Sequence, residues 1–221
     1  MEYLTHSLLS PQGSEELANK LLLNKSDWED GKKSAGSQAS KVKNNLQLDK
    51  TSKTSIKCSD YVLNALKKDH LIKSFCLPKA FHGIMFSRTN SGEGYGTHID
   101  NAYMKSGRSD LSFTLFLSKA SSYQGGALQI ETMQETKEIK LDSGEIIIYP
   151  SNSLHSVEKV SNGERLVCIG WIQSHVKSNE DRNTLFGLDA GARGLLAKHG
   201  LSPELDLVFQ SYNNLLRRLG D

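Results

Sequence analysis

Two histidines and one aspartate in the middle of the chain are of the types that bind a transition metal. His98 and Asp100 form a His-x-Asp triplet just after a glycine-rich turn, and His155 follows in a Pro-Ser-Asn-Ser-Leu-His segment. Two imidazoles and one carboxylate form the facial triad of non-haem ferrous centres, in which the other coordination positions stay open. A structural zinc site would instead be closed by four protein ligands. These residue types therefore favour an iron site that is open to small molecules.

The His-x-Asp triplet is a weak signal on its own, because histidine beside aspartate is common at protein surfaces. Residues i and i+2 of a β-strand point to the same face, so a strand over 96–102 would bring His98 and Asp100 together. His155 begins a later strand-like run of the same β region. We expect the two strands to be non-adjacent and to face one another across the interior, which would complete the three ligands.

Arg165 begins the strand-like run that follows His155. Taken alone, an arginine at the start of a strand is more often exposed. Its guanidinium is permanently charged, and its planar fork can hold a carboxylate through two hydrogen bonds. Beside an open metal site, we predict that Arg165 binds the carboxylate of a ligand.

The middle of the chain has the pattern of a mainly β domain, with helices on both sides. Many short strands separated by turn residues predict a sandwich or barrel. The expected strands cover 83–89, 96–102, 112–117, 127–131, 137–141, 145–149, 155–160 and 165–172. Helical spacing predicts helices from Ser10 or Ser14 to about Asn24, over 59–75, and from about 203 to 219 within a helical tail that begins near Asn179.

Two other segments have structural rather than functional interpretations. The polar stretch 28–48 is expected to be a long loop with one short strand, and its lysines Lys32, Lys33, Lys41 and Lys43 to be solvated, although they could steer an anionic substrate. The helix 205–219 is expected to pack on the core.

Composition and the lengths of the apolar runs argue against a nucleic-acid-binding protein and against a membrane protein. The 221 residues carry a formal net charge of only +2, which does not argue for binding to nucleic acid. Cys58, Cys76 and Cys168 form no Cys-x-x-Cys pair and predict free thiols in a reducing compartment. Apolar runs are far too short to span a bilayer, which takes about 20 residues. With no signal-like N-terminus, we expect a cytoplasmic protein without a membrane partner.

The chain resembles the PKHD-type hydroxylases, bacterial iron(II)- and 2-oxoglutarate-dependent dioxygenases related to prolyl and lysyl hydroxylases. The resemblance covers nearly the whole chain, including the polar stretch 28–48. The motifs that carry it are Asp-Gly-Lys at 30–32, Ala-Gly-Ser-Gln at 35–38, Val-Lys-Asn-Asn at 42–45, Tyr-Gly-Thr-His-Ile-Asp at 95–100, Asp-Leu-Ser-Phe-Thr-Leu-Phe-Leu-Ser at 110–118, Gly-Gly-Ala-Leu at 125–128, Tyr-Pro-Ser-Asn-Ser-Leu-His at 149–155 and Gly-Trp-Ile-Gln-Ser at 170–174.

This resemblance implies a double-stranded β-helix (jelly-roll) core over 80–174, with N-terminal support from 1–79 and a C-terminal helical segment over 175–221. It implies that His98, Asp100 and His155 bind Fe(II) and that Arg165 binds 2-oxoglutarate. The implied reaction hydroxylates a substrate with O₂ while 2-oxoglutarate becomes succinate and CO₂, and L-ascorbate keeps the iron reduced. The substrate, a small molecule or a peptidyl side chain, is not identified, and an oligomer is possible.

Two alternatives stay open at the level of sequence. A cupin-like dioxygenase would need no co-substrate and would leave Arg165 without a role. A non-catalytic sensor would bind iron or 2-oxoglutarate and signal through a partner. Formation of succinate separates the first alternative from the expected enzyme, and turnover of a substrate separates the second.

Overall fold

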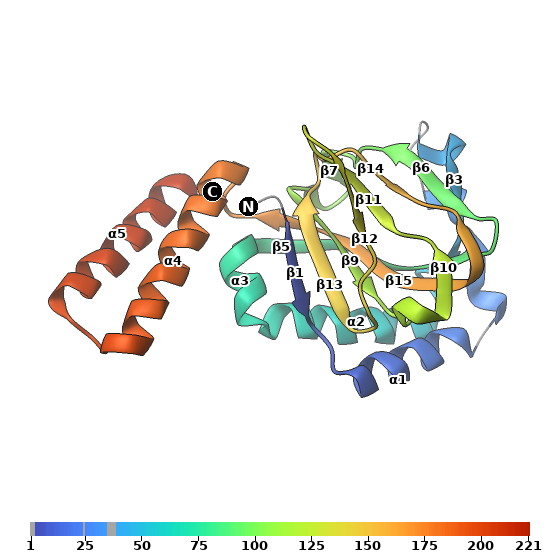
Figure 1. Ribbon diagram of the computed structural model, residues 1–221, viewed down its shortest axis with the longest axis horizontal. Helices are drawn as coiled ribbons and strands as arrows, with labels where there is room; N and C mark the ends of the chain where they lie inside the picture. Colours follow the sequence, from blue (N-terminus) through green and yellow to red (C-terminus); the bar gives the residue numbers. More distant parts are fainter. Residues whose placement is uncertain (1–2, 24, 35–38) are drawn as a thin grey trace.

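The computed structural model describes residues 3–23, 25–34 and 39–221, and two antiparallel sheets form its core (Figure 1). The large sheet has the order β1 (Leu4–Ser7), β13 (Glu145–Pro150), β9 (Leu111–Phe116), β15 (Val160–Ser174), β5 (Pro78–Asn90), β4 (Leu46–Leu48) and β2 (Trp28–Asp30), with β10 (Tyr123–Gly125) paired to β15. The smaller sheet has the order β12 (Thr136–Ile139), β11 (Leu128–Glu131), β14 (His155–Val157), β6 (Gly94–His98) and β3 (Lys43–Asn44). β7 (Tyr103–Met104) and β8 (Gly107–Arg108) form a separate hairpin.

The central strands of the large sheet are buried on both faces, as β13 shows. Ile146 and Ile148 belong to the apolar cluster beneath the helices, whereas Ile147 and Tyr149 belong to the cluster between the two sheets. Successive side chains of a strand point to opposite faces. A strand that is covered on both sides therefore has consecutive apolar residues in its sequence. The expected mainly β architecture with flanking helices is confirmed.

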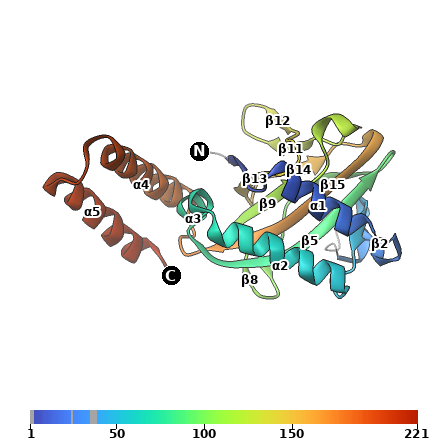
Figure 2. The same ribbon diagram turned by 90° about the horizontal axis from the view of Figure 1, so that it is seen from below.

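Helices α1 (Pro11–Leu22) and α2 (Lys53–Lys68) lie side by side across the outer face of the large sheet (Figure 2). Leu17 and Leu21 of α1 and Val62 and Leu66 of α2 are buried in the same cluster as the sheet residues. Ser10 begins α1, because its Oγ accepts a hydrogen bond from the backbone N–H of Gly13. This start was expected; the expected end, Asn24, lies outside the described residues.

The single helix expected over Ser59–Phe75 is wrong at its start and in its middle. α2 begins earlier because the Oγ of Ser52 accepts a hydrogen bond from the N–H of Ser55 at 3.1 Å. Asp69 then takes an extended conformation and ends α2, and its carboxylate accepts the N–H of Ile72 at 2.8 Å to begin α3 (His70–Cys76). A side chain that caps well can thus divide a continuous helical pattern.

The expected strands of the middle region are present, with shifted ends. The largest consequence concerns the strand expected over 96–102, because β6 ends at His98 and Asp100 lies in the following loop. The stretch 28–48, expected to be a loop with one short strand, contains β2, β3 and β4, which extend both sheets. The segment before residue 80 therefore supplies strands as well as helices. The Ala-Gly-Ser-Gln motif at 35–38 lies outside the described residues.

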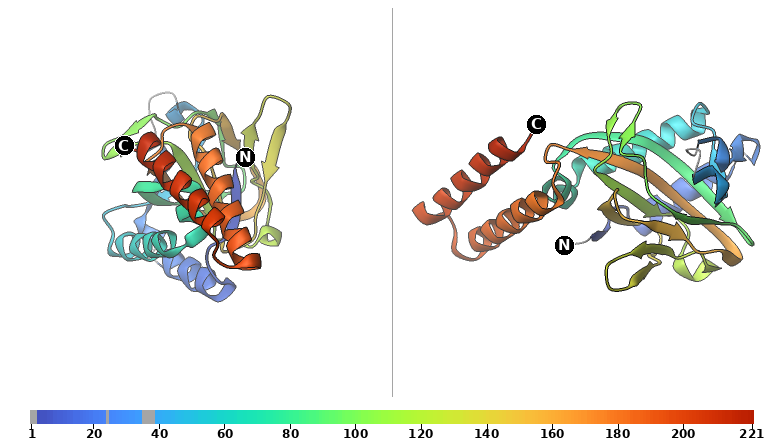
Figure 3. Two further views of the ribbon diagram at one scale, coloured as in Figure 1. Left: turned by 90° about the vertical axis from the view of Figure 1, so that its left-hand side faces the viewer. Right: turned by 90° about the horizontal axis from the view of Figure 1, so that it is seen from above.

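The C-terminal helices α4 (Asn179–His199) and α5 (Pro203–Leu219) form a hairpin that projects away from the sheets (Figures 1 and 3). The expectation that α5 packs on the core is wrong, because α5 packs against α4, and of its residues only Leu205 is buried. α4 contacts α3 through Phe186, whose ring meets that of Phe75 edge-on with centroids 5.4 Å apart. Within the described residues, no helix is long and apolar enough to cross a membrane.

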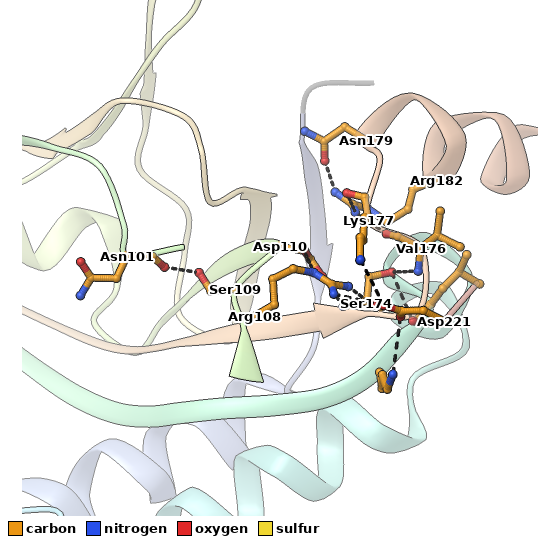
Figure 4. A network of polar contacts seen from close by, with 12 residues as sticks. Asn101, Arg108, Ser109, Asp110, Ser174, Val176, Lys177, Asn179, Arg182 and Asp221 are labelled. Atoms are coloured by element: carbon orange, nitrogen blue, oxygen red, sulfur yellow. Dashed lines mark hydrogen bonds and ion pairs between the residues drawn. The ribbon is translucent and has the colours of Figure 1, made fainter. Parts of the chain in front are cut away.

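A polar network holds the base of this hairpin to the sheets (Figure 4). Arg108 on β8 binds Asp110 at 2.6 Å and Asp221 at 3.2 Å. Arg182 of α4 donates to the carbonyl oxygen of Val176 at 2.6 Å. The chain end and the first turns of α4 are thereby attached to the end of β15.

Candidate metal centre

His98, Asp100 and His155 meet at one point of the smaller sheet. Their ligand atoms all lie within 4.8 Å of one another, and they are the single such group within the described part of the chain. β6 and β14 are hydrogen-bonded neighbours in which His98 and His155 are paired in register, so the expectation that the two strands face each other across the interior is wrong. Because His98 and His155 are cross-strand neighbours, their imidazole rings lie close together, with centroids 4.2 Å apart.

Both histidines are held in the tautomer that a metal ligand needs. Nδ1 of His98 donates to the carbonyl oxygen of Gly96 at 2.9 Å, and Nδ1 of His155 donates to that of Ser153 at 3.0 Å. A carbonyl oxygen only accepts hydrogen bonds, so the proton of each neutral ring is on Nδ1. Each Nε2 therefore keeps its lone pair, and the backbone bond fixes the orientation of the ring.

Asp100 is oriented by two buried serines, although it lies beyond the end of β6. Its Oδ2 accepts a hydrogen bond from the Oγ of Ser112 at 2.5 Å, and this Oγ is 2.8 Å from the Oγ of Ser151. Oδ2 also lies 3.9 Å from Nε2 of His155. Both serines belong to motifs that carry the family resemblance, but no spacing rule marks a serine as the support of a ligand.

Burial keeps the imidazole of His98 neutral. Desolvation, together with repulsion from His155, lowers the pKa of His98 to about 4. The ring of Tyr95 stacks on that of His98 with centroids 3.7 Å apart, which covers one of its faces. At neutral pH the ring is therefore ready to bind a metal without losing a proton.

The three residues open into a cavity of about 130 Å³ between the two sheets. Alternate residues of β15, Arg165, Val167, Ile169 and Trp171, line its large-sheet side. These residues share one face of the strand because side chains alternate along it.

Arg165 is buried in this cavity, with 3 % of its surface exposed. Its Nε and Nη2 have no hydrogen-bond partner among the described residues, and its guanidinium lies 5.3 Å from the ring centroid of Phe116. Buried polar groups nearly always have partners, so an arginine with unused donors in a cavity indicates an anionic ligand. The commoner interpretation, an exposed arginine at a strand start, does not hold.

Lys43 also lines the cavity and is 5 % exposed, so the expectation that it is solvated is wrong. Sequence reasoning missed its burial because Lys32, Lys33 and Lys41 of the same stretch are indeed exposed. Only the pairing of β3 with β6 turns Lys43 inward. The three cysteines are free thiols, as expected, and all three are buried.

Comparison with known proteins identifies the family. Residues 84–173 match the model of the 2OG-Fe(II) oxygenase superfamily. The chain is 64 % identical to a PKHD-type hydroxylase of Prochlorococcus marinus (strain MIT 9211) and 61 % identical to one of strain NATL1A, with each pair matched over 100 % of both chains. The chain belongs to the PKHD-type hydroxylases. It is therefore an iron(II)- and 2-oxoglutarate-dependent dioxygenase, and the resemblance seen in the sequence is confirmed.

Solved structures support the fold. A Pseudomonas putida prolyl-4-hydroxylase superimposes with a TM-score of 0.56 at 16 % identity, covering 78 % of this chain and 92 % of its own. A Trichoplax adhaerens prolyl hydroxylase, solved with a peptide fragment of hypoxia inducible factor, gives a TM-score of 0.56 at 15 % identity, covering 83 % and 86 %. At such identities the likeness concerns the fold and says nothing about the substrate of this PKHD-type hydroxylase.

Proposed function

We propose that this protein hydroxylates its substrate at an iron(II) centre held by His98, Asp100 and His155, with 2-oxoglutarate bound by Arg165 and converted to succinate and CO₂. The observation that carries the proposal is the buried guanidinium of Arg165, which has unused donors in the same cavity as the three ligand side chains. A site for a metal alone would not require this cation. We also propose that the two sheets form the double-stranded β-helix of this superfamily.

When bound, the metal would supply the activation of O₂ and the oxidation of a C–H bond. The protein supplies geometry: backbone carbonyls orient both imidazoles, and Ser112 orients the carboxylate of Asp100. Arg165 would receive the distal carboxylate of 2-oxoglutarate through its fork. L-ascorbate belongs to this proposal as the reductant that would restore iron oxidised in unproductive turnovers.

Apolar side chains form part of the wall of the cavity that holds Arg165 and the candidate ligands. Val167 on β15, Leu128 on β11 and Val157 on β14 all line the cavity. Such a wall would exclude water from the co-substrate, which strengthens the attraction between its carboxylate and the guanidinium. The same exclusion would protect the oxidant from side reactions.

Formation of succinate tests this proposal. With Fe(II), 2-oxoglutarate and O₂, we expect the wild type to form succinate even without its substrate, slowly. Arg165→Leu should raise the KM for 2-oxoglutarate by about 30-fold or more, because losing one partner of a buried charge pair costs roughly 2–5 kcal/mol. Arg88→Leu is the control, since Arg88 pairs with Glu164 and does not line the cavity.

Two results would contradict the proposal. The first is oxygen consumption without succinate, which would indicate the cupin-like alternative. The second is equal KM values for Arg165→Leu and Arg88→Leu, which would show that Arg165 does not bind the co-substrate.

A further inference from the structure

Asp100 is the one candidate ligand that lies outside a strand, in the loop between β6 and β7. Loops are more mobile than strands, so a ligand in a loop needs support from another part of the chain. Ser109 gives this support to the loop backbone. Its Oγ donates to the carbonyl oxygen of Asn101 at 2.7 Å, and its N–H donates to that of Ala102 at 2.9 Å. One buried serine therefore binds the two residues that follow Asp100.

Arg108 and Asp110, on either side of Ser109, attach this serine to the end of β15 (Figure 4). Nε of Arg108 donates to Oδ1 of Asp110 at 2.6 Å, and the two side chains are only 15 % and 7 % exposed. Both also bond the backbone of Ser174. Nη2 of Arg108 donates to its carbonyl oxygen at 2.9 Å, and its N–H donates to Oδ2 of Asp110 at 2.8 Å. The ion pair thus holds both polar backbone groups of one residue of β15.

A second series of hydrogen bonds leads from the ion pair to the carboxylate of Asp100. The carbonyl oxygen of Asp110 accepts the N–H of Ser151 at 3.1 Å. The Oγ of Ser151 is 2.8 Å from that of Ser112, which donates to Asp100 at 2.5 Å. The segment that begins at the ion pair therefore supports both the backbone of the loop and the side chain of the ligand.

We propose that Arg108 is a positioning residue for the metal centre, which fixes Ser109 and Asp110 and, through them, the loop that carries Asp100. This inference rests on the proposed function and extends it to a residue outside the cavity lining. Arginine suits this role because its planar fork bonds several partners at once, here including Asp221, to which Nη1 donates at 3.2 Å.

The test is a titration of the metal-free full chain with Fe(II) under anaerobic conditions. Arg108→Lys keeps the positive charge beside Asp110 but cannot bond all the partners of the fork. Ser109→Ala removes the donor to Asn101 without changing any charge. We expect the Kd for Fe(II) to rise at least about threefold in each variant, less than the roughly 10- to 100-fold effect of losing a direct partner of a ligand.

Each variant has a matched control at the other end of β5 and β15. Arg88→Lys makes the same exchange in another partly buried ion pair, that of Arg88 with Glu164. Ser91→Ala also removes a serine that donates to a backbone carbonyl oxygen, that of Ser161 at 2.8 Å. Both controls should bind Fe(II) as the wild type does. Urea denaturation of all four variants shows how much of any change in Kd accompanies a general loss of stability.

A second readout separates positioning of Asp100 from a general disturbance of the cavity. With Fe(II) saturating, we measure the concentration of 2-oxoglutarate that half-develops the visible charge-transfer band. Arg108→Lys should leave this concentration unchanged, because Arg165 and its contacts remain as they are. A weaker affinity for the metal with an unchanged affinity for 2-oxoglutarate is the signature of a displaced Asp100.

The inference is overturned if Arg108→Lys or Ser109→Ala binds Fe(II) as tightly as its control, or if Arg108→Lys weakens the binding of 2-oxoglutarate as much as that of the metal. If Arg108→Lys does not fold, Ser109→Ala decides. Failure of the proposed function is distinguishable, because the wild type itself would then bind no Fe(II) and both proposals would fall. A normal band in the wild type, with unchanged Fe(II) affinity in the variants, overturns this inference alone.

Discussion

At the scale of single residues, the candidate metal centre depends on side chains that would not touch the metal. Ser112 donates to Asp100 at 2.5 Å and is itself 2.8 Å from Ser151, so the carboxylate is held although it lies in a loop. Such supporting hydrogen bonds restrict a ligand to the orientation that binding needs.

Replacing Ser112 by alanine should therefore weaken iron binding without abolishing it. We expect the Kd for Fe(II) to rise roughly 10- to 100-fold, the usual effect of losing a partner of a ligand. Titration of the apoprotein with Fe(II) under anaerobic conditions measures this. Ser156→Ala is the control, because Ser156 is next to His155 but bonds Gln129 instead. Equal affinities for the two variants would show that Ser112 does not support the site.

The three candidate ligands and Arg165 could be proposed from the sequence, because their chemistry is specific and their motifs resemble a known family, and the structure brings all four to one cavity. The two residues that structure adds, Ser112 and Lys43, could not. Serine and lysine are common, and whether Lys43 is solvated depends on the pairing of β3 with β6, two short strands whose contact is distant in sequence. Only the tertiary fold decides this burial.

At the scale of elements, the N-cap residues decide where the helices on the outer face of the large sheet begin. Ser52 caps α2, whereas Ser59, the start that spacing predicts, lies within that helix. The pattern of apolar residues locates the buried face of a helix but not its first turn, because the first turn depends on a single side-chain hydrogen bond.

This difference can be measured by alanine substitution at both serines. Ser52→Ala should lower the free energy of unfolding by about 1 kcal/mol, since it leaves the N–H of Ser55 without its acceptor. Ser59→Ala should change it by no more than about 0.5 kcal/mol, because alanine is the better helix former. Urea denaturation gives both values. A larger loss at Ser59 than at Ser52 would place the start of α2 where the sequence pattern placed it.

The strands of the middle region were predictable because apolar runs alternate with glycine-rich turns. β2 (Trp28–Asp30), β3 (Lys43–Asn44) and β4 (Leu46–Leu48) were not, since two or three residues are too few to display a period. These short strands nevertheless complete the cavity, because β3 carries Lys43 and adjoins the strand of His98.

At the scale of the whole molecule, the α4–α5 hairpin and the sheets are two regions with limited contact (Figure 3). Amphipathic spacing correctly predicts that one face of α5 packs against another element, but it does not identify that element. The structure places α4 there instead of the core. Phe186 and the network around Arg108 join the hairpin to the rest.

Phe186→Ala should loosen the hairpin selectively. Losing the edge-on contact with Phe75 removes about 0.5–1.5 kcal/mol in addition to apolar burial. We expect faster amide hydrogen exchange over 179–219, with unchanged exchange in β9, β13 and β15. An equal increase in those strands would show that the hairpin and the sheets unfold together. Leu207→Ala, at an exposed position of α5, is the control.

The central claim is that one cavity holds iron(II) and 2-oxoglutarate together, and anaerobic spectroscopy of the purified protein tests it most directly. Adding Fe(II) and then 2-oxoglutarate to the wild type should produce a visible charge-transfer band, which requires the co-substrate to bind the metal. His98→Ala should abolish the band by losing the metal, and Arg165→Leu should form it only at much higher 2-oxoglutarate concentration. Absence of the band in the wild type, or its full retention in His98→Ala, would contradict the account.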